Sequence, residues 1–281
     1  MPGPRVVAIG DSVTLGVGDG VQDPTGEVGW AAHVAHGLDA SEFTNLAANG
    51  TRARNLIPDQ VERALGLNPV VILLTIGGND VLRGDFDEAE IEDCVREAVH
   101  RLRTSGAEIM LVSLAHITLF DLFHPSITRV MTGRIDRTNT AILRAIEGMD
   151  VTVIDGMRAM TQMGRVAWHM DRIHPSPIGH RGLAERALVE IPYRKVNSIP
   201  PPAEPASFVQ ISWWFLKNGV PWIAKRSRDL IPQTLIVVMR ELRSERKREA
   251  HRVRAMLDER GRLRTTTPSS NKPVKNRHAT N

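Results

Sequence analysis

Two segments of this sequence carry residue types that together can perform nucleophilic catalysis. Gly10-Asp11-Ser12-Val13 places a hydroxyl directly after an apolar run that begins near Arg5. Far downstream, Asp171 and His174 stand three residues apart, so that on a turn the carboxylate can hold one imidazole nitrogen and leave the other as a base. Pro175 disfavours a helix at His174 and keeps it at a loop edge. These residue types predict nucleophilic catalysis.

A developing oxyanion needs hydrogen-bond donors, and two further segments supply candidates. The first, Asn45-Leu46-Ala47-Ala48-Asn49-Gly50, ends in a glycine, and the second, Gly77-Gly78-Asn79-Asp80, contains an asparagine amide. Taken alone, the segment around Ser12 fits equally well a phosphate-cradling turn or a plain helix cap. The combination of all four segments favours catalysis.

The elements that must position these residues alternate between strand and helix. The predicted strands are Arg5–Ile9, Phe43–Ala47, Val70–Ile76, Glu108–Leu114 and Val151–Ile154. Amphipathic helices are predicted over Ile91–Leu102, over Ile135–Ile146 and after Pro177. This order predicts a parallel sheet with helices on both faces, whose chemistry lies at the carboxyl ends of the strands.

The four segments, in this order, resemble the SGNH (GDSL-type) serine hydrolase family of esterases and lipases over about residues 4–190. The resemblance implies an α/β fold: a three-layer, flavodoxin-like, parallel five-stranded sheet in strand order 2-1-3-4-5. Val13 stands where the name-giving motif has leucine, at a position of apolar packing. The roles that the resemblance implies are nucleophile and oxyanion donor for Ser12, further oxyanion donors for Gly50 and Asn79, and the rest of the catalytic triad for Asp171 and His174.

Other classes of protein and site lack their signatures. The single cysteine, Cys94, excludes an intrachain disulfide framework and a cysteine-rich metal site, and the histidines show no ligand spacing. No Gly-x-Ser-x-Gly elbow follows a predicted strand, and neither a P-loop nor a dinucleotide-binding fingerprint is present. We therefore expect neither a metal nor a cofactor.

The apolar segment His116–Pro125 leaves two interpretations open. It either begins a helix packed on the core or forms a wall for an acyl chain, which favours medium or long acyl groups over acetate. His169 is a further candidate pocket residue, because it precedes Asp171 by two positions. The candidate wall residues are Leu119, Phe120, Leu122 and Phe123.

Charge divides the chain into parts. Residues 1–206 hold 19 basic and 26 acidic residues, whereas residues 207–281 hold 17 basic and 6 acidic ones. We expect a hydrolase domain over residues 1–195, a proline-rich linker over 196–206, an amphipathic basic helical extension over 207–260 and a disordered tail over 261–281.

The extension places Trp213, Trp214 and Trp222 among lysines and arginines, a composition that suits the headgroups of an anionic membrane. Packing on the hydrolase domain and homodimerisation through the apolar stripe remain alternatives. Nucleic acid is disfavoured, because the basic region has no reading motif. No apolar signal segment or run of 18 apolar residues occurs, so we expect a cytoplasmic protein, peripheral to the membrane if the extension binds there.

The function expected from these features is hydrolysis of carboxylic esters through an acyl-serine intermediate. Small-molecule or lipid esters are the expected substrates, with lysophospholipid or acyl-lipid esters ahead of acetylated sugars. The alternative is a membrane-associated or oligomerising binding protein that keeps the fold without turnover. The complete set of Ser12, Asn79, Asp171 and His174 argues against that alternative.

Overall fold

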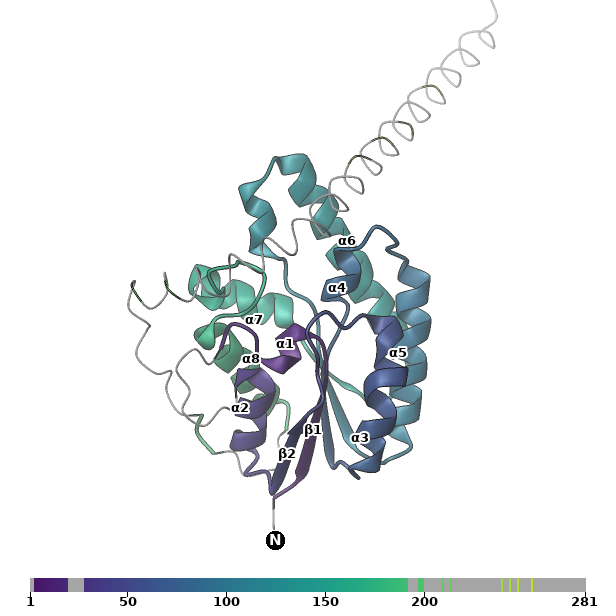
Figure 1. Ribbon diagram of the computed structural model, residues 1–281, viewed down its shortest axis with the longest axis vertical. Coiled ribbons are helices and arrows are strands. Elements are labelled where there is room, and N and C mark those ends of the chain that lie inside the picture. Colours follow the sequence, from purple (N-terminus) through teal and green to yellow (C-terminus); the bar gives the residue numbers. More distant parts are fainter. Residues whose placement is uncertain are drawn as a thin grey trace, which may run out of the picture. The chain divides into compact units, whose positions relative to one another are not determined.

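A parallel sheet of five strands in the order β2-β1-β3-β4-β5 forms the centre of the protein, as the resemblance implied (Figure 1). The computed structural model describes residues 3–19, 28–191 and 197–199, and six single residues beyond them. In the register of the sheet, Val7 lies opposite Thr44 on one side and Ile72 on the other. The strands are β1 (Arg5–Gly10), β2 (Glu42–Asn45), β3 (Val71–Thr75), β4 (Glu108–Val112) and β5 (Thr152–Ile154).

Alternating side chains of the strands face two separate cores. Val6 and Ala8 of β1 pack under one layer of helices, whereas Val7 and Ile9 pack under the other. The first layer contains α2 (Gly29–Gly37), α7 (Gly156–Met163) and α8 (Pro177–Val189), and the second contains α3 (Glu62–Gly66), α5 (Glu88–Arg103) and α6 (Pro125–Ala145).

Two short helices begin where strands end. They are α1 (Ser12–Leu15), directly after β1, and α4 (Gly78–Val81), shortly after β3. Both therefore lie at the carboxyl edge of the sheet, where parallel α/β folds gather their functional groups. Single turns of other helix types also occur, over Ala53–Asn55, Ile57–Val61, Thr118–Leu122 and Gly164–Ala167.

The predicted strands and helices are present, with one large difference in length. The helix expected over Ile135–Ile146 begins at Pro125, and His124 caps it by accepting a hydrogen bond from Ser126 N–H at 3.3 Å. Part of the apolar segment before it forms the 3₁₀ helix Thr118–Leu122. The apolar segment His116–Pro125 therefore contains a helical turn of its own, which neither interpretation predicted.

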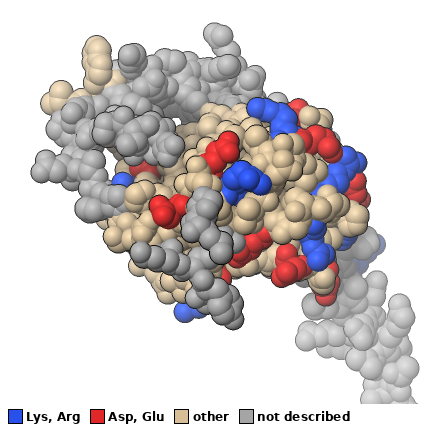
Figure 2. All heavy atoms as spheres, turned by 90° about the horizontal axis from the view of Figure 1, so that it is seen from below, with Lys and Arg blue, Asp and Glu red and all other residues tan. Residues whose placement is uncertain are grey.

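Surface charges on the described part of the chain are mixed in sign. Figure 2 shows acidic and basic side chains interspersed on the face at the amino ends of the strands. Arg101 illustrates this, because it contacts both Glu97 and Glu62. Among the described helices, none has the length and apolar character needed to cross a membrane.

The expected linker is described only over residues 197–199, and the expected extension only at six single positions. These positions are helical and exposed, and they are Val209, Trp213, Met239, Arg243, Lys247 and Arg254. The chain divides into two compact units, Met1–Val238 and Met239–Asn281. The boundaries expected at 195, 206 and 260 remain predictions.

Candidate active site

A continuous line of hydrogen bonds joins a serine, a histidine and an aspartate at the carboxyl edge of the sheet. Ser12 Oγ lies 2.9 Å from His174 Nε2, and His174 Nδ1 lies 2.7 Å from Asp171 Oδ2. Ser12 and His174 are buried, with 7% and 6% of their surfaces exposed. In this geometry the imidazole can accept the serine proton while the carboxylate holds its other nitrogen.

The turn that carries Ser12 requires an unusual backbone. Gly10 ends β1 with φ of +127°, and a Cβ added there would lie 2.1 Å from the carbonyl oxygen of Thr75, so only glycine fits. Asp11 then caps α1 by accepting a hydrogen bond from Val13 N–H at 3.0 Å. Burial raises the pKa of Asp11 to about 7. The strand end thus presents Ser12 as the first residue of the helix.

Asp171 organises the loop on which it stands. Its Oδ1 accepts hydrogen bonds from the backbone N–H groups of Ile173, at 2.9 Å, and His174, at 3.0 Å, which leaves Oδ2 to hold the imidazole. Burial alone would raise the pKa of Asp171, but hydrogen bonds to His169 and His174 outweigh burial and hold that pKa well below its usual range. The carboxylate is therefore ionised near neutral pH.

His169 lies against the carboxylate of the triad. Its Nδ1 is 3.4 Å from Asp171 Oδ2, and only 10% of its side chain is exposed. We predicted a pocket residue at this position, which stays a prediction; the structure shows that His169 contacts Asp171. Its contact adds a second imidazole to the carboxylate that holds His174.

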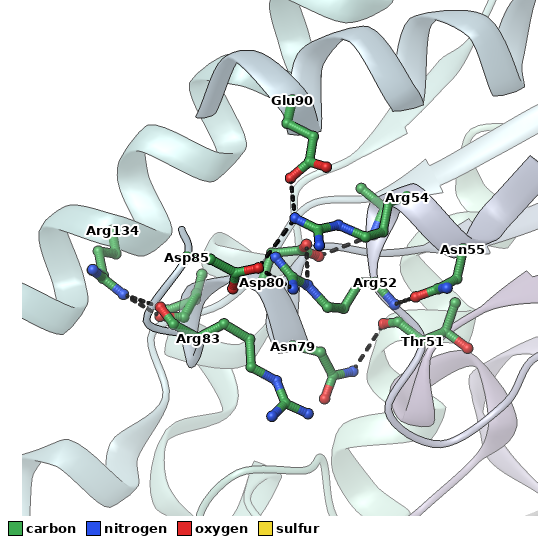
Figure 3. A network of polar contacts seen from close by, with 12 residues as sticks. Thr51, Arg52, Arg54, Asn55, Asn79, Asp80, Arg83, Asp85, Glu90 and Arg134 are labelled. Atoms are coloured by element: carbon green, nitrogen blue, oxygen red, sulfur yellow. Dashed lines mark hydrogen bonds and ion pairs between the residues drawn. The ribbon is translucent and has the colours of Figure 1, made fainter. Parts of the chain in front are cut away.

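The three expected oxyanion donors come from three different loops. The backbone N–H groups of Ser12 and Gly50 have no acceptor within the described part of the chain. Gly50 has φ of +87°, a left-handed conformation that favours glycine. Asn79 Nδ2 donates to Thr51 O at 3.1 Å, which fixes the orientation of the amide and leaves its second hydrogen free (Figure 3).

Two buried residues that the sequence analysis did not identify contact these loops. They are Gln60, in the π-helical turn Ile57–Val61, and Asp80, in α4, each with 2% of its surface exposed. Asp80 follows Asn79 directly in a segment that we had already singled out. Gln60 has no local signal, although a π-helical turn is often found at a functional site.

The described residues contain no group of three or more His, Cys, Asp or Glu side chains that could hold a metal ion. His180, in α8, is fully buried and serves the fold, because it accepts from Trp30 N–H and donates to Val17 O. Nothing in the arrangement around Ser12 requires a cofactor for acyl transfer.

Comparisons with known proteins identify the family and the fold. A family model described as the GDSL-like lipase/acylhydrolase family matches residues 8–181. No curated protein matches the chain.

Among the solved structures that share the fold are an esterase and a lipase. An acetylxylan esterase from Geobacillus stearothermophilus is 24% identical with a TM-score of 0.55, and the match covers 70% of this chain and 97% of that one. A lipase from a goat rumen metagenome is 18% identical with a TM-score of 0.54, covering 68% and 98%. At these identities the likeness concerns the SGNH hydrolase fold alone.

Proposed function

Since this chain belongs to the GDSL-like lipase/acylhydrolase family and is a carboxylic ester hydrolase, we propose that it works through an acyl-serine intermediate formed on Ser12. The observation that supports this most strongly is the line of hydrogen bonds from Ser12 Oγ through His174 to Asp171 Oδ2. A serine hydroxyl is a weak nucleophile until an adjacent base accepts its proton. His174 Nε2 stands at the distance that this transfer needs.

In the first half of the reaction, Ser12 Oγ attacks the ester carbonyl carbon while His174 Nε2 takes the hydroxyl proton. The carbonyl oxygen becomes an oxyanion, which accepts hydrogen bonds from Ser12 N–H, Gly50 N–H and Asn79 Nδ2. Collapse of this intermediate breaks the bond to the leaving alkoxide oxygen, which takes the proton from His174. The alcohol departs and the acyl group stays on Ser12.

In the second half, water replaces the alcohol. His174 takes a proton from the water as its oxygen attacks the acyl carbon, and the same donors hold the second oxyanion. Collapse breaks the bond to Ser12 Oγ, which recovers its proton from His174. Asp171 remains a carboxylate throughout and stabilises the imidazolium that forms in each half.

Exposed apolar side chains near the catalytic loop favour acyl-lipid esters as the substrate class. Leu119 N–H donates to Arg172 O at 3.0 Å, so the 3₁₀ helix Thr118–Leu122 lies against the loop that carries Asp171 and His174. Leu122 and Phe123 follow with 61% and 50% of their surfaces exposed, and Met170 on the catalytic loop is 46% exposed. Such surface suits an acyl chain better than an acetyl group.

The predicted wall residues differ in how far they are buried and in which surface they line. Phe120 is buried at 6% exposure and packs inside the protein, as expected for a helix start on the core. Phe123 lines a groove of about 580 Å³ along the first turns of α6, and none of the described residues that line the groove belongs to the triad. Leu119 and Leu122 therefore carry the acyl-wall proposal better than Phe120 does.

Hydrolysis of a nitrophenyl ester series, from acetate to palmitate, tests the proposal. We expect Ser12→Ala to lose turnover of every ester, and wild type to prefer medium or long chains. An optimum at acetate would contradict the acyl-lipid proposal and leave the serine mechanism intact. Full turnover by Ser12→Ala would contradict the mechanism itself.

A further inference from the structure

The three oxyanion donors are useful only if three separate loops keep one fixed arrangement. Ser12 follows β1, Gly50 lies in the loop after β2, and Asn79 lies in α4 after β3. Electrostatic stabilisation of a transition state depends on donors that are already in place, because moving them during the reaction costs free energy. The structure contains two buried side chains that tie these loops together.

Gln60 joins the nucleophile turn to the Gly50 loop. Its Oε1 accepts from Gly10 N–H at 2.6 Å and its Nε2 donates to Gly10 O at 3.0 Å, so it holds both backbone groups of one residue. The same Nε2 lies 3.2 Å from Thr51 Oγ1, to which it donates. Gly10 is two residues before Ser12, and Thr51 directly follows Gly50. One amide therefore sets the distance between two donors of the hole.

Asp80 joins the Gly50 loop to Asn79. Its Oδ1 accepts from Arg52 Nε and its Oδ2 accepts from Ala53 N–H, both at 3.0 Å (Figure 3). Arg52 is itself held on its other side by Asp85, at 2.9 Å. Because Asp80 is the residue after Asn79, these contacts connect the amide donor to the segment that follows Gly50.

Desolvation makes the ion pair between Asp80 and Arg52 a weak source of folding stability. Burial raises the pKa of Asp80, and the Ala53 N–H and the guanidinium oppose that rise. Buried ion pairs often contribute no more stability than apolar residues of the same size. Such a pair instead fixes orientation, because hydrogen bonds to both carboxylate oxygens of Asp80 allow only one geometry.

We propose that Gln60 and Asp80 are positioning residues that hold Ser12, Gly50 and Asn79 in one register, so that the oxyanion hole is formed before the ester binds. Both act through backbone and side-chain groups of the loops. The inference rests on the proposed function, because it requires an oxyanion at this place.

Two substitutions test it by kinetics on a soluble nitrophenyl ester. Gln60→Met keeps the length of the side chain and removes every hydrogen bond of its amide. Asp80→Asn replaces one carboxylate oxygen with an NH₂ group, which then faces one of the two donors, Arg52 Nε or Ala53 N–H. Deleting a whole oxyanion donor typically lowers kcat about 10²–10³-fold, so displacing donors is expected to lower kcat roughly 10–100-fold. KM should stay within about threefold, since the ground-state ester gains little from these donors.

A double-mutant cycle with Asn79→Ala separates positioning from general damage. If Asp80 acts by holding the Asn79 amide, Asp80→Asn should cost less than about threefold in the Asn79→Ala background, because that donor is already lost, whereas Gln60→Met, which displaces the Ser12 and Gly50 N–H groups, should keep its effect there. An Asp80→Asn effect that multiplies fully in that background, or kcat values of Gln60→Met and Asp80→Asn equal to wild type, would overturn the proposal.

Controls keep the outcomes distinct. Glu62→Gln, two residues after Gln60, removes an exposed partner of Arg101 and none of the contacts of Gln60 or Asp80 described above, so it should leave kcat unchanged. Thr51→Val removes the hydroxyl that accepts from Gln60 Nε2 and donates to Ala48 O at 2.8 Å, so it tests the link between Gln60 and this loop if Gln60→Met does not fold; we expect a threefold to tenfold loss of kcat. An active Ser12→Ala would refute the proposed function, whereas an inactive Ser12→Ala beside fully active Gln60→Met and Asp80→Asn would refute only this inference.

Discussion

At the scale of single residues, Asp171 decides which nitrogen of His174 carries a proton. Its Oδ1 is occupied by the N–H groups of Ile173 and His174, so only Oδ2 faces the imidazole, at 2.7 Å. An anionic oxygen there requires a proton on Nδ1 and leaves Nε2 free to accept one from Ser12. Because the pKa of Asp171 lies well below its usual range, the carboxylate that holds the Nδ1 proton is ionised near neutral pH.

Asp171→Asn is expected to lower kcat about 10³–10⁴-fold while the protein stays folded. The new Oδ1 can keep both backbone hydrogen bonds, and the amide nitrogen then faces His174 Nδ1. A donor at that position selects the tautomer protonated on Nε2, which cannot take the serine proton. Steady-state kinetics and a thermal unfolding midpoint check the two halves of this expectation. Activity within threefold of wild type would show that Asp171 does not set the tautomer.

The residues of the triad could be predicted because their chemistry is visible locally. Ser12 follows a strand, and Asp171 and His174 are three positions apart on one loop. Gln60 could not be predicted, because it lies 50 positions from Gly10 in the sequence and no local pattern predicts their contact. Only the packing of Ile57–Val61 against the end of β1 brings the two together. Positioning residues of this kind are properties of the fold.

At the scale of elements, His180 connects α8 to the segment that carries Ser12. Its Nδ1 accepts from Trp30 N–H of α2 at 3.1 Å, and its Nε2 donates to Val17 O, two residues after α1, at 3.0 Å. Burial lowers the pKa of His180 from 6.5 to about 4. The imidazole is therefore neutral in the folded protein near neutral pH.

This burial links stability to pH with a definite sign. Between pH 6.5 and about 4 the unfolded chain protonates this histidine and the folded chain does not, so the unfolded state binds more protons. The contribution of His180 to the free energy of unfolding is complete above pH 6.5 and is lost as the pH falls toward 4. This loss is at most roughly 3 kcal/mol.

His180→Asn should flatten this dependence. The asparagine oxygen can accept from Trp30 N–H, but nothing then donates to Val17 O, so we expect the variant to lose about 1–2 kcal/mol at pH 7. Urea unfolding at pH 7, 5.5 and 4.5 should show this stability difference nearly closing at pH 5.5 and reversing in sign at pH 4.5, because only the wild type loses the contribution of the histidine as the pH falls. A gap that stays constant would mean that His180 does not titrate in this way.

The strands could be predicted more closely than the longest helix for a physical reason. Buried parallel strands are continuous apolar runs, as Val71–Thr75 is. The first half of α6 contains Thr128, Thr132 and Gly133, which are weak helix formers, so the periodicity pointed only to its second half. Tertiary contacts help to support that first half, because Arg134 donates to the carbonyl oxygens of Val81 and Arg83.

At the scale of the whole molecule, charge is distributed unevenly along the chain. The excess of acidic residues before position 207 contrasts with 17 basic and 6 acidic residues after it. Trp213 is 69% exposed and Met239 is 50% exposed. Exposed tryptophan and basic side chains on one extension suit an anionic lipid surface, and that surface would also present acyl-lipid esters.

We therefore expect the full chain to sediment with vesicles that contain phosphatidylserine and not with vesicles of phosphatidylcholine alone. Arg243→Glu with Lys247→Glu, two exposed positions, should weaken this binding about 30-fold, from about 1 kcal/mol lost per basic residue. Added salt should weaken the binding of wild type in the same direction, because the attraction is between exposed charges.

Arg63→Glu with Arg103→Glu provides the matched control, because it changes the net charge equally at exposed positions of α3 and α5. If total charge alone drives binding, both double variants will lose it to the same extent. If the extension is the lipid contact, only Arg243→Glu with Lys247→Glu will stay in the supernatant, and its turnover of a soluble nitrophenyl ester will match wild type. Sedimentation of that variant at the wild-type level would exclude these charges from lipid binding and leave packing or dimerisation as the role of the extension.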